Sequence, residues 1–169
     1  RAARNIVDLG AGSGVVGLLL AGKYPKAHVT LLELQKSLHR LAEKNIRLNG
    51  LEDRVEAVLS DVREPAGLNG LDLVVSNPPF RSPGTGRLSV GDERAVVRHE
   101  IELTLPDLAR AAASILKSRG RFCLVHLPER LPDVVDILRE YRLEPKRVRF
   151  VHGRRNSEAR IMLLEAVRH

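Results

Sequence analysis

The chain has 169 residues with a formal net charge of +7, and its length suits one domain in which helices cover a sheet. Its longest apolar stretch, residues 15–21, is far shorter than the roughly 18 consecutive apolar residues that indicate a membrane span. A single cysteine, Cys123, excludes an intramolecular disulfide and a cysteine-rich metal site. We therefore expect a cytoplasmic protein with no membrane segment and no metal.

The positive charge is unevenly placed, because most of the excess lies in the last third of the chain. A basic face lowers the free energy of contact with phosphates, although many basic domains bind no nucleic acid. The chain does not begin with methionine, so we expect an upstream segment before a single domain of residues 1–169.

Short runs rich in Val, Ile and Leu alternate with helical patterns, which is typical of an α/β fold with a mostly parallel sheet. In chain order, strands are predicted at residues 5–9, 28–33, 55–59, 71–76, 121–126, 146–151 and 160–166. Helices are predicted at 15–23, 35–49, 99–117 and 132–141. The Gly153 turn between the last two strands indicates an antiparallel hairpin that closes a seven-stranded sheet.

Several helix boundaries have residues suited to them. Asn49-Gly50 is expected to end the second helix in a left-handed conformation, and Gly120 is expected to do the same before the fifth strand. Pro132 suits the first turn of a helix. Residues 81–97 have no clear period and are predicted to form a long loop.

The first predicted strand leads into a glycine-rich loop, Asp8-Leu-Gly10-Ala11-Gly12-Ser-Gly14, and then into a helix. Three glycines let the backbone turn sharply and approach a ligand closely, while the helix start presents unpaired N–H groups. Asp8 is expected to have two roles: it hydrogen-bonds the loop backbone and it contributes to ligand binding.

The ends of the next two strands carry groups suited to a nucleoside. Glu33, followed by Leu34, comes about 20 residues after the loop, the spacing at which a carboxylate binds ribose hydroxyls in nucleotide folds. Asp61 is expected to accept a hydrogen bond from an adenine amino group, and the N–H of Val62 to donate to a ring nitrogen.

Two ligands fit this loop. Gly12-Ser-Gly14-Val-Val-Gly17 formally matches the dinucleotide fingerprint, so a nicotinamide or flavin enzyme is one alternative. In that register Gly10 would stand where a strand residue is expected and Asp8 would have no task, which favours S-adenosylmethionine.

The segment Asn77-Pro78-Pro79-Phe80 follows the fourth predicted strand. Two prolines stiffen the backbone, so that the side-chain oxygen of Asn77 and the carbonyl of Pro78 form a rigid pair of acceptors. Such a pair would bind both protons of an aromatic amine and direct its lone pair at a methyl group, with no metal or nucleophilic residue. Phe80 would stack on the acceptor base, whereas Phe122 and Phe150 lie in predicted strands and are expected in the core.

Together these residues resemble the class I methyltransferases that act on amino groups, which implies a Rossmann-like three-layer sandwich. The resemblance implies that Asp8, Gly10, Ala11, Gly12, Gly14, Glu33, Leu34, Asp61, Val62 and Asn77 bind S-adenosylmethionine. It also implies that Asn77, Pro78, Pro79 and Phe80 hold the target amine.

More narrowly, residues 77–80, 98–100 and 151–160 resemble the tRNA adenine-N6 methyltransferases that modify a valine tRNA beside its anticodon. RNA, with tRNA as the expected form, is then the partner, and Arg98, His99, Arg154 and Arg155 are candidate RNA contacts. Arg98 and His99 are equally compatible with a plain helix start. Phe80 stands where many adenine enzymes have Tyr, which leaves guanine N2 of rRNA and glutamine N5 of a protein as alternatives. A non-catalytic RNA-binding module is a further one.

Overall fold

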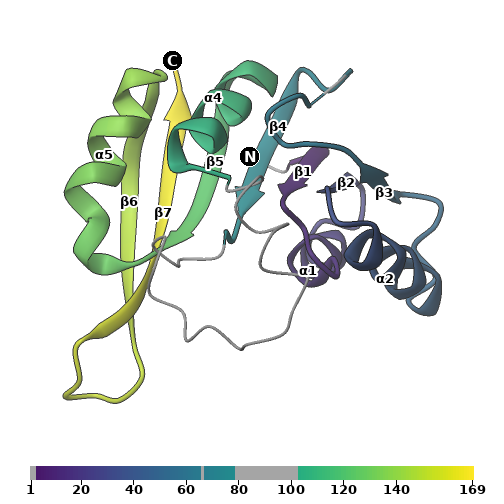
Figure 1. The fold of residues 1–169 in the computed structure, drawn as a ribbon, viewed down its shortest axis with the longest axis horizontal. Helices are drawn as coiled ribbons and strands as arrows, with labels where there is room; N and C mark the ends of the chain where they lie inside the picture. Colours follow the sequence, from purple (N-terminus) through teal and green to yellow (C-terminus); the bar gives the residue numbers. More distant parts are fainter. Residues whose placement is uncertain (1–2, 66, 79–102) are drawn as a thin grey trace, which may run out of the picture.

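A seven-stranded sheet in the order β3-β2-β1-β4-β5-β7-β6 forms the centre of the computed structural model, which describes residues 3–65, 67–78 and 103–169 (Figure 1). The strands are β1 (Asn5–Leu9), β2 (His28–Glu33), β3 (Val55–Leu59), β4 (Leu71–Ser76), β5 (Leu116–His126), β6 (Leu143–His152) and β7 (Ala159–Arg168). Strands β1 to β5 are parallel, and β7 is antiparallel to both β5 and β6.

Helices cover both faces of the sheet, which gives the three layers of the expected sandwich. One layer has α1 (Val15–Lys23) and α2 (Lys36–Leu48); the other has α4 (Leu105–Ile115) and α5 (Leu131–Glu140), which follows a short 3₁₀ turn, Pro128–Arg130. None of these helices, which are all those in the described ranges, has the length and apolar character needed to cross a bilayer.

The core is divided by the sheet because successive side chains of a strand point to opposite faces. In β1, Val7 and Leu9 pack with Leu108 of α4 and Phe122 of β5. Ile6 packs on the other face with residues of α1 and α2. The sheet is thus buried on both sides in its centre, as the continuous apolar strands predict.

Most of the predicted elements are confirmed. Strands β1 to β4 and helix α1 have the predicted bounds, and Gly50 takes the left-handed conformation expected after α2, with φ of +61°. The two C-terminal strands form the predicted hairpin but are longer at both ends. Pro132 lies in the first turn of α5, as expected.

The prediction of a helix over residues 99–117 is wrong at both ends, since residues 103–104 precede the helix and residues 116–117 follow it; residues 99–102 lie outside the described ranges. Thr104 caps α4 through a capping box with Asp107, so the helix begins at Leu105. At Leu116 the backbone becomes extended and pairs with Leu71 of β4, so residues 116–120 belong to β5. The sequence pattern typical of a helix extends beyond Ile115, but from Leu116 the pairing with β4 determines the backbone conformation.

The predicted role of Gly120 is wrong for the same reason. Gly120 lies inside β5, and Arg119 takes the left-handed conformation, with φ of +62°. A Cβ at Gly120 would lie 2.9 Å from the backbone oxygen of Leu71. This glycine is therefore needed for close approach of the backbone to β4 rather than for ending a helix.

Close packing of α1 on β2 depends on Gly17, and this gives a prediction for stability. A Cβ at Gly17 would lie 2.1 Å from Cδ2 of Leu31, which is fully buried, so the leucine or the helix would have to shift. We expect Gly17→Ala to lower the free energy of unfolding by about 1–3 kcal/mol, measured by urea denaturation. Gly22→Ala in the same helix is the control, because a Cβ there meets nothing within 4 Å and alanine raises helix stability by up to about 1 kcal/mol. Equal effects of the two changes would contradict the packing argument.

Candidate functional site

The predicted cofactor loop and the predicted amine-binding segment leave the sheet from adjacent strands. Leu9, the last residue of β1, is paired with Ser76, the last residue of β4, and the Ser76 hydroxyl donates to the Leu9 carbonyl oxygen at 2.8 Å. Gly10 and Asn77 follow these two residues directly. The chain winds outward in opposite directions from β1 and β4, and ligands of open α/β sheets bind at such a switch point.

The glycine loop has the left-handed backbone that its composition predicts. Gly10, Gly12 and Gly14 have φ of +69°, +58° and +85°, values that other residues adopt only at a cost. The N–H groups of Gly10 and Ala11 both donate to the carbonyl oxygen of Leu32, at 2.9 and 3.0 Å. The loop is therefore fastened to the end of β2.

Glu33 links the loop to the start of α2. Its Oε2 accepts from the N–H of Gly12 at 2.7 Å, and its Oε1 accepts from the N–H of Gln35 at 2.8 Å. Only 6% of the residue is exposed. Each carboxylate oxygen has a second acceptor position, so these bonds leave Glu33 able to bind hydroxyl groups as well. Leu34, which follows it, is half-buried.

Asp8 is buried beneath the loop, with 2% of its surface exposed, and its Oδ2 accepts from the N–H of Gly17 at 2.9 Å. Burial raises the pKa of Asp8 from 3.8 to about 7; the Gly17 hydrogen bond opposes this rise and the charge of Glu33 adds to it. Asp8 was expected to bond the loop backbone, but its hydrogen-bond donor is in the first turn of α1 instead.

Helix α2 holds the other side of the loop, which the sequence analysis missed. The Asn45 side chain donates to the carbonyl oxygen of Ser13 at 2.9 Å. A Cβ at Gly14 would lie 2.7 Å from Cδ1 of Leu31 and 3.5 Å from the Ala42 side chain. The position of Asn45 on the face of α2 that carries Ala42 and Ile46 was the available signal, since an amide on a buried face needs a partner.

Asp61 lies beyond the end of β3 and is paired with Arg63. The Arg63 backbone N–H and Nε donate to Oδ1, and Nε and Nη2 donate to Oδ2, at 2.6 to 3.0 Å. The Arg63 guanidinium holds the pKa of Asp61 below its ordinary value. A ligand amine at Asp61 would have to replace one of these donors. The pair is local and partly exposed, so replacement costs little. Val62 is buried in the core.

Of the amine-binding segment, Asn77 and Pro78 are described: Asn77 is exposed and Pro78 is half-buried. Pro79, Phe80, Arg98 and His99 lie outside the described residues. Arg154 and Arg155 are exposed in the β6–β7 turn. The structure therefore brings Asp8, residues 10–14, Glu33 and Asn77 to one edge of the sheet, the edge formed by the carboxyl ends of the parallel strands. Strand β6 also ends and β7 begins at this edge.

His126 at the end of β5 is a polar residue of this edge that the sequence analysis did not single out. Ser76 is paired with Leu124, so His126 lies two residues beyond the last paired residue of β5 with β4. Its Nδ1 accepts from the N–H of Leu127 at 2.9 Å. Burial lowers the pKa of His126, which favours the neutral ring.

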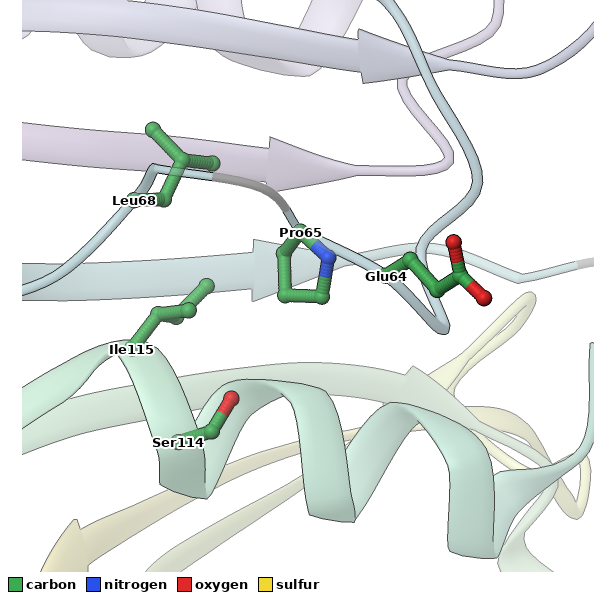
Figure 2. Close-up of a pocket in the computed structure, with 5 residues that line it drawn as sticks. All are labelled: Glu64, Pro65, Leu68, Ser114 and Ile115. Atoms are coloured by element: carbon green, nitrogen blue, oxygen red, sulfur yellow. The ribbon is translucent and has the colours of Figure 1, made fainter.

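A hollow in the described part of the chain lies away from this edge. It has a volume of about 320 Å³ between the β3–β4 connection and the end of α4. Figure 2 shows Pro65, Leu68 and Ile115 around a common space, with the Glu64 carboxylate turned away from it. This hollow is mainly apolar and shares no residue with the glycine loop, so it is separate from the candidate site.

The strand order, the helices on both faces and the glycine loop after β1 define a class I methyltransferase fold. The chain belongs to the methyltransferase small domain family, whose model matches residues 1–131. Membership confirms that the domain is that of a methyltransferase and that its cofactor is S-adenosylmethionine, which decides against the nicotinamide or flavin alternative.

Curated relatives and solved structures agree with this assignment. The chain is 30% identical to a tRNA1(Val) (adenine(37)-N6)-methyltransferase of Porphyromonas gingivalis over 96% of this chain and 65% of the relative. It is 35% identical to the protein of that name from an Enterobacter species over 75% of this chain and 51% of the relative. The chain thus spans about two thirds or less of the length of these relatives. A crystal structure of a predicted O-methyltransferase of Agrobacterium tumefaciens matches with 26% identity and a TM-score of 0.76, covering 99% of this chain and 74% of that one.

The buried carboxyl of Asp8 gives a prediction for pH dependence. Because its folded pKa of about 7 lies above its ordinary 3.8, its contribution to stability is complete below pH 4 and is lost as the pH rises through 7. We expect the unfolding free energy of Asp8→Asn, minus that of the parent, to rise by about 1 kcal/mol or more between pH 4 and 7.5, measured by urea denaturation. A constant difference for Asp8→Asn would disprove the raised pKa.

Proposed function

We propose that this protein transfers a methyl group from S-adenosylmethionine to N6 of an adenine in tRNA, in the cytoplasm. The observation that carries the proposal is the pairing of Leu9 with Ser76, which sets the glycine loop and Asn77 side by side at the switch point of the sheet. The names of the relatives support adenine N6 and tRNA as acceptor and substrate.

The cofactor supplies an electrophilic methyl group on a sulfonium. The backbone around Gly10 to Gly14 and the carboxylate of Glu33 would bind its amino-acid and ribose parts, since both are fixed before the ligand arrives. Asp61 would exchange a bond with Arg63 for one with the adenine amino group of the cofactor. The preformed loop lowers the ordering cost of binding.

At the acceptor, the task of the protein is orientation. The exocyclic amine of adenine is a poor nucleophile because its lone pair is delocalised into the ring. The amide oxygen of Asn77 and the carbonyl of Pro78 would accept the two amine protons, which directs the lone pair toward the methyl group. Asn77 is exposed at the edge and so is accessible to a base swung out of an RNA loop, where unstacking costs least.

This role of Asn77 can be tested directly. We expect Asn77→Ala to lower turnover by about 100-fold or more, by analogy with the loss of a preorganised polar group, while the affinity for S-adenosylmethionine changes by less than about threefold. Turnover is measured with labelled cofactor, and affinity by calorimetry. Asn69→Ala, at an exposed position just before the opposite end of β4, should change neither. Turnover of Asn77→Ala within a few fold of the parent would refute its role.

The acceptor is tested by incubating the protein with labelled cofactor and separate pools of tRNA, rRNA, DNA and protein, followed by nucleoside and amino-acid analysis. We expect N6-methyladenosine from the tRNA pool. N2-methylguanosine from the rRNA pool would mean that guanine, not adenine, is the acceptor. Methylglutamine from the protein pool would mean that the acceptor is a glutamine side chain. Binding of RNA without binding of S-adenosylmethionine would instead leave a non-catalytic module.

A further inference from the structure

The β6–β7 hairpin extends past the edge of the sheet from which the glycine loop and Asn77 leave (Figure 1). Strand β6 ends and β7 begins at this edge because β7 is antiparallel to β5, whose last residue, His126, is also there. In the strand order, β7 is the second strand from β4 and β6 is the third. Neighbouring strands are about 4.8 Å apart, so the base of the hairpin is about 10–14 Å from Asn77.

The hairpin has a strong positive charge with little to balance it. Between Glu144 and Glu158 the chain has no acidic residue and carries Lys146, Arg147, Arg149, Arg154 and Arg155. Two carboxylates oppose this charge: Glu165 lies 3.7 Å from Nε of Arg147, and Glu144 interacts electrostatically with Lys146. Arg147 nevertheless has 82% of its side chain exposed.

The turn at residues 152–158, the hairpin tip, is held in one shape by its own hydrogen bonds. The Ser157 hydroxyl accepts from the N–H of Arg154 at 3.0 Å and lies 2.9 Å from the Arg154 carbonyl oxygen, to which it donates. His152 Nδ1 donates to the carbonyl oxygen of Ser157 at 2.8 Å. Arg154 and Arg155 are exposed on this turn, and neither side chain forms an ion pair with a described residue. The fixed backbone of the turn therefore presents both guanidinium groups to solvent beyond the end of the sheet.

Phe150 contradicts the expectation that it lies in the core. It is 44% exposed, whereas Phe122 is fully buried as predicted. Phe150 is paired with the buried Met162, but β6 is the last strand of the sheet and this part of it carries exposed residues on both faces. An exposed aromatic ring on a strand that leads into a turn with two exposed arginines offers both features that bind unpaired nucleotides, a ring for the bases and cations for the phosphates.

A simpler explanation for the charge is protection of the outermost strand, since charged residues on such a strand prevent it from pairing with other chains. That explains Lys146, Arg147 and Arg149, which lie along β6. It does not explain two arginines on a fastened turn beyond the end of the strand, nor an exposed phenylalanine, which would favour aggregation.

From this we infer that the β6–β7 hairpin is the RNA-docking surface of the protein: Arg154 and Arg155 bind phosphates next to the target nucleotide, and Phe150 stacks on a neighbouring unpaired base. The inference rests on the proposed function, because it takes RNA as the acceptor. It adds the surface that holds the RNA strand while one base reaches Asn77.

The test measures binding of a fluorescein-labelled, unmodified tRNA transcript by anisotropy between 50 and 200 mM salt. We expect the double variant Arg154→Ala/Arg155→Ala to weaken binding about tenfold and to reduce the slope of log affinity against log salt by about 1.5, the value for two lost phosphate contacts. Arg154→Lys/Arg155→Lys should stay within about threefold of the parent, because the contacts depend on charge. The control is Lys26→Ala/Arg47→Ala, which removes the same charge from exposed positions at the opposite edge and should leave affinity and slope almost unchanged.

Stacking by Phe150 has a different signature. Phe150→Leu keeps an apolar side chain, so we expect binding to weaken about fivefold or more with no change in the salt slope, because no phosphate contact is lost. Thermal unfolding of each variant shows whether the hairpin still folds, and Phe150→Tyr, which retains a ring, should bind as the parent does.

Methyl transfer by the parent to the same tRNA, measured in parallel, separates the two proposals. If the parent methylates tRNA while the double alanine variant keeps the parent's affinity and slope, the docking surface is wrong and the function stands. Equal losses in the variant and in the charge control would also refute the surface. If the parent neither binds nor methylates the tRNA, the proposed function fails and the docking surface with it.

Discussion

Two buried carboxylates hold the glycine loop between β1 and α1. Glu33 binds the N–H groups of Gly12 and Gln35, and Asp8 binds the N–H of Gly17, so the loop is fixed from the end of β2 and from below. Hydrogen bonds from backbone N–H groups to carboxylates are stronger than those between neutral groups. The left-handed glycines supply a backbone that can turn within this space, and the Leu9–Ser76 pair then sets Asn77 beside it.

The first half of the fold could be predicted from the sequence because local pattern and tertiary structure agree there. Strands β1 to β4 are short apolar runs flanked by turn-forming residues, and these residues coincide with the observed strand ends. The second half could be predicted less well. The helical sequence pattern of α4 continues into residues that instead pair with β4 as part of β5. The sequence of β6 is typical of a strand but does not show that Phe150 is exposed.

For the site, the sequence predicted which residue types stand at the ends of the strands, because a parallel sheet brings those ends together. It could not predict their partners. The bonds of Glu33 to Gly12, of Asn45 to Ser13 and of Asp61 to Arg63 each depend on the path of a loop rather than on spacing. His126 was missed because a histidine at a strand end is conspicuous only once the register of β5 against β4 is known.

The two carboxylates also constrain the charge of the ligand. Burial raises the pKa of Asp8, and the negative charge of Glu33 adds to this rise. A pyrophosphate over Gly10 to Gly14 would bring further negative charge and would drive Asp8 further toward its protonated form. A cation there would do the opposite: it would lower the pKa of Asp8 and be attracted by both carboxylates. The loop therefore favours a ligand with positive charge, such as an ammonium and a sulfonium, over a dinucleotide whose glycine pattern it formally shares.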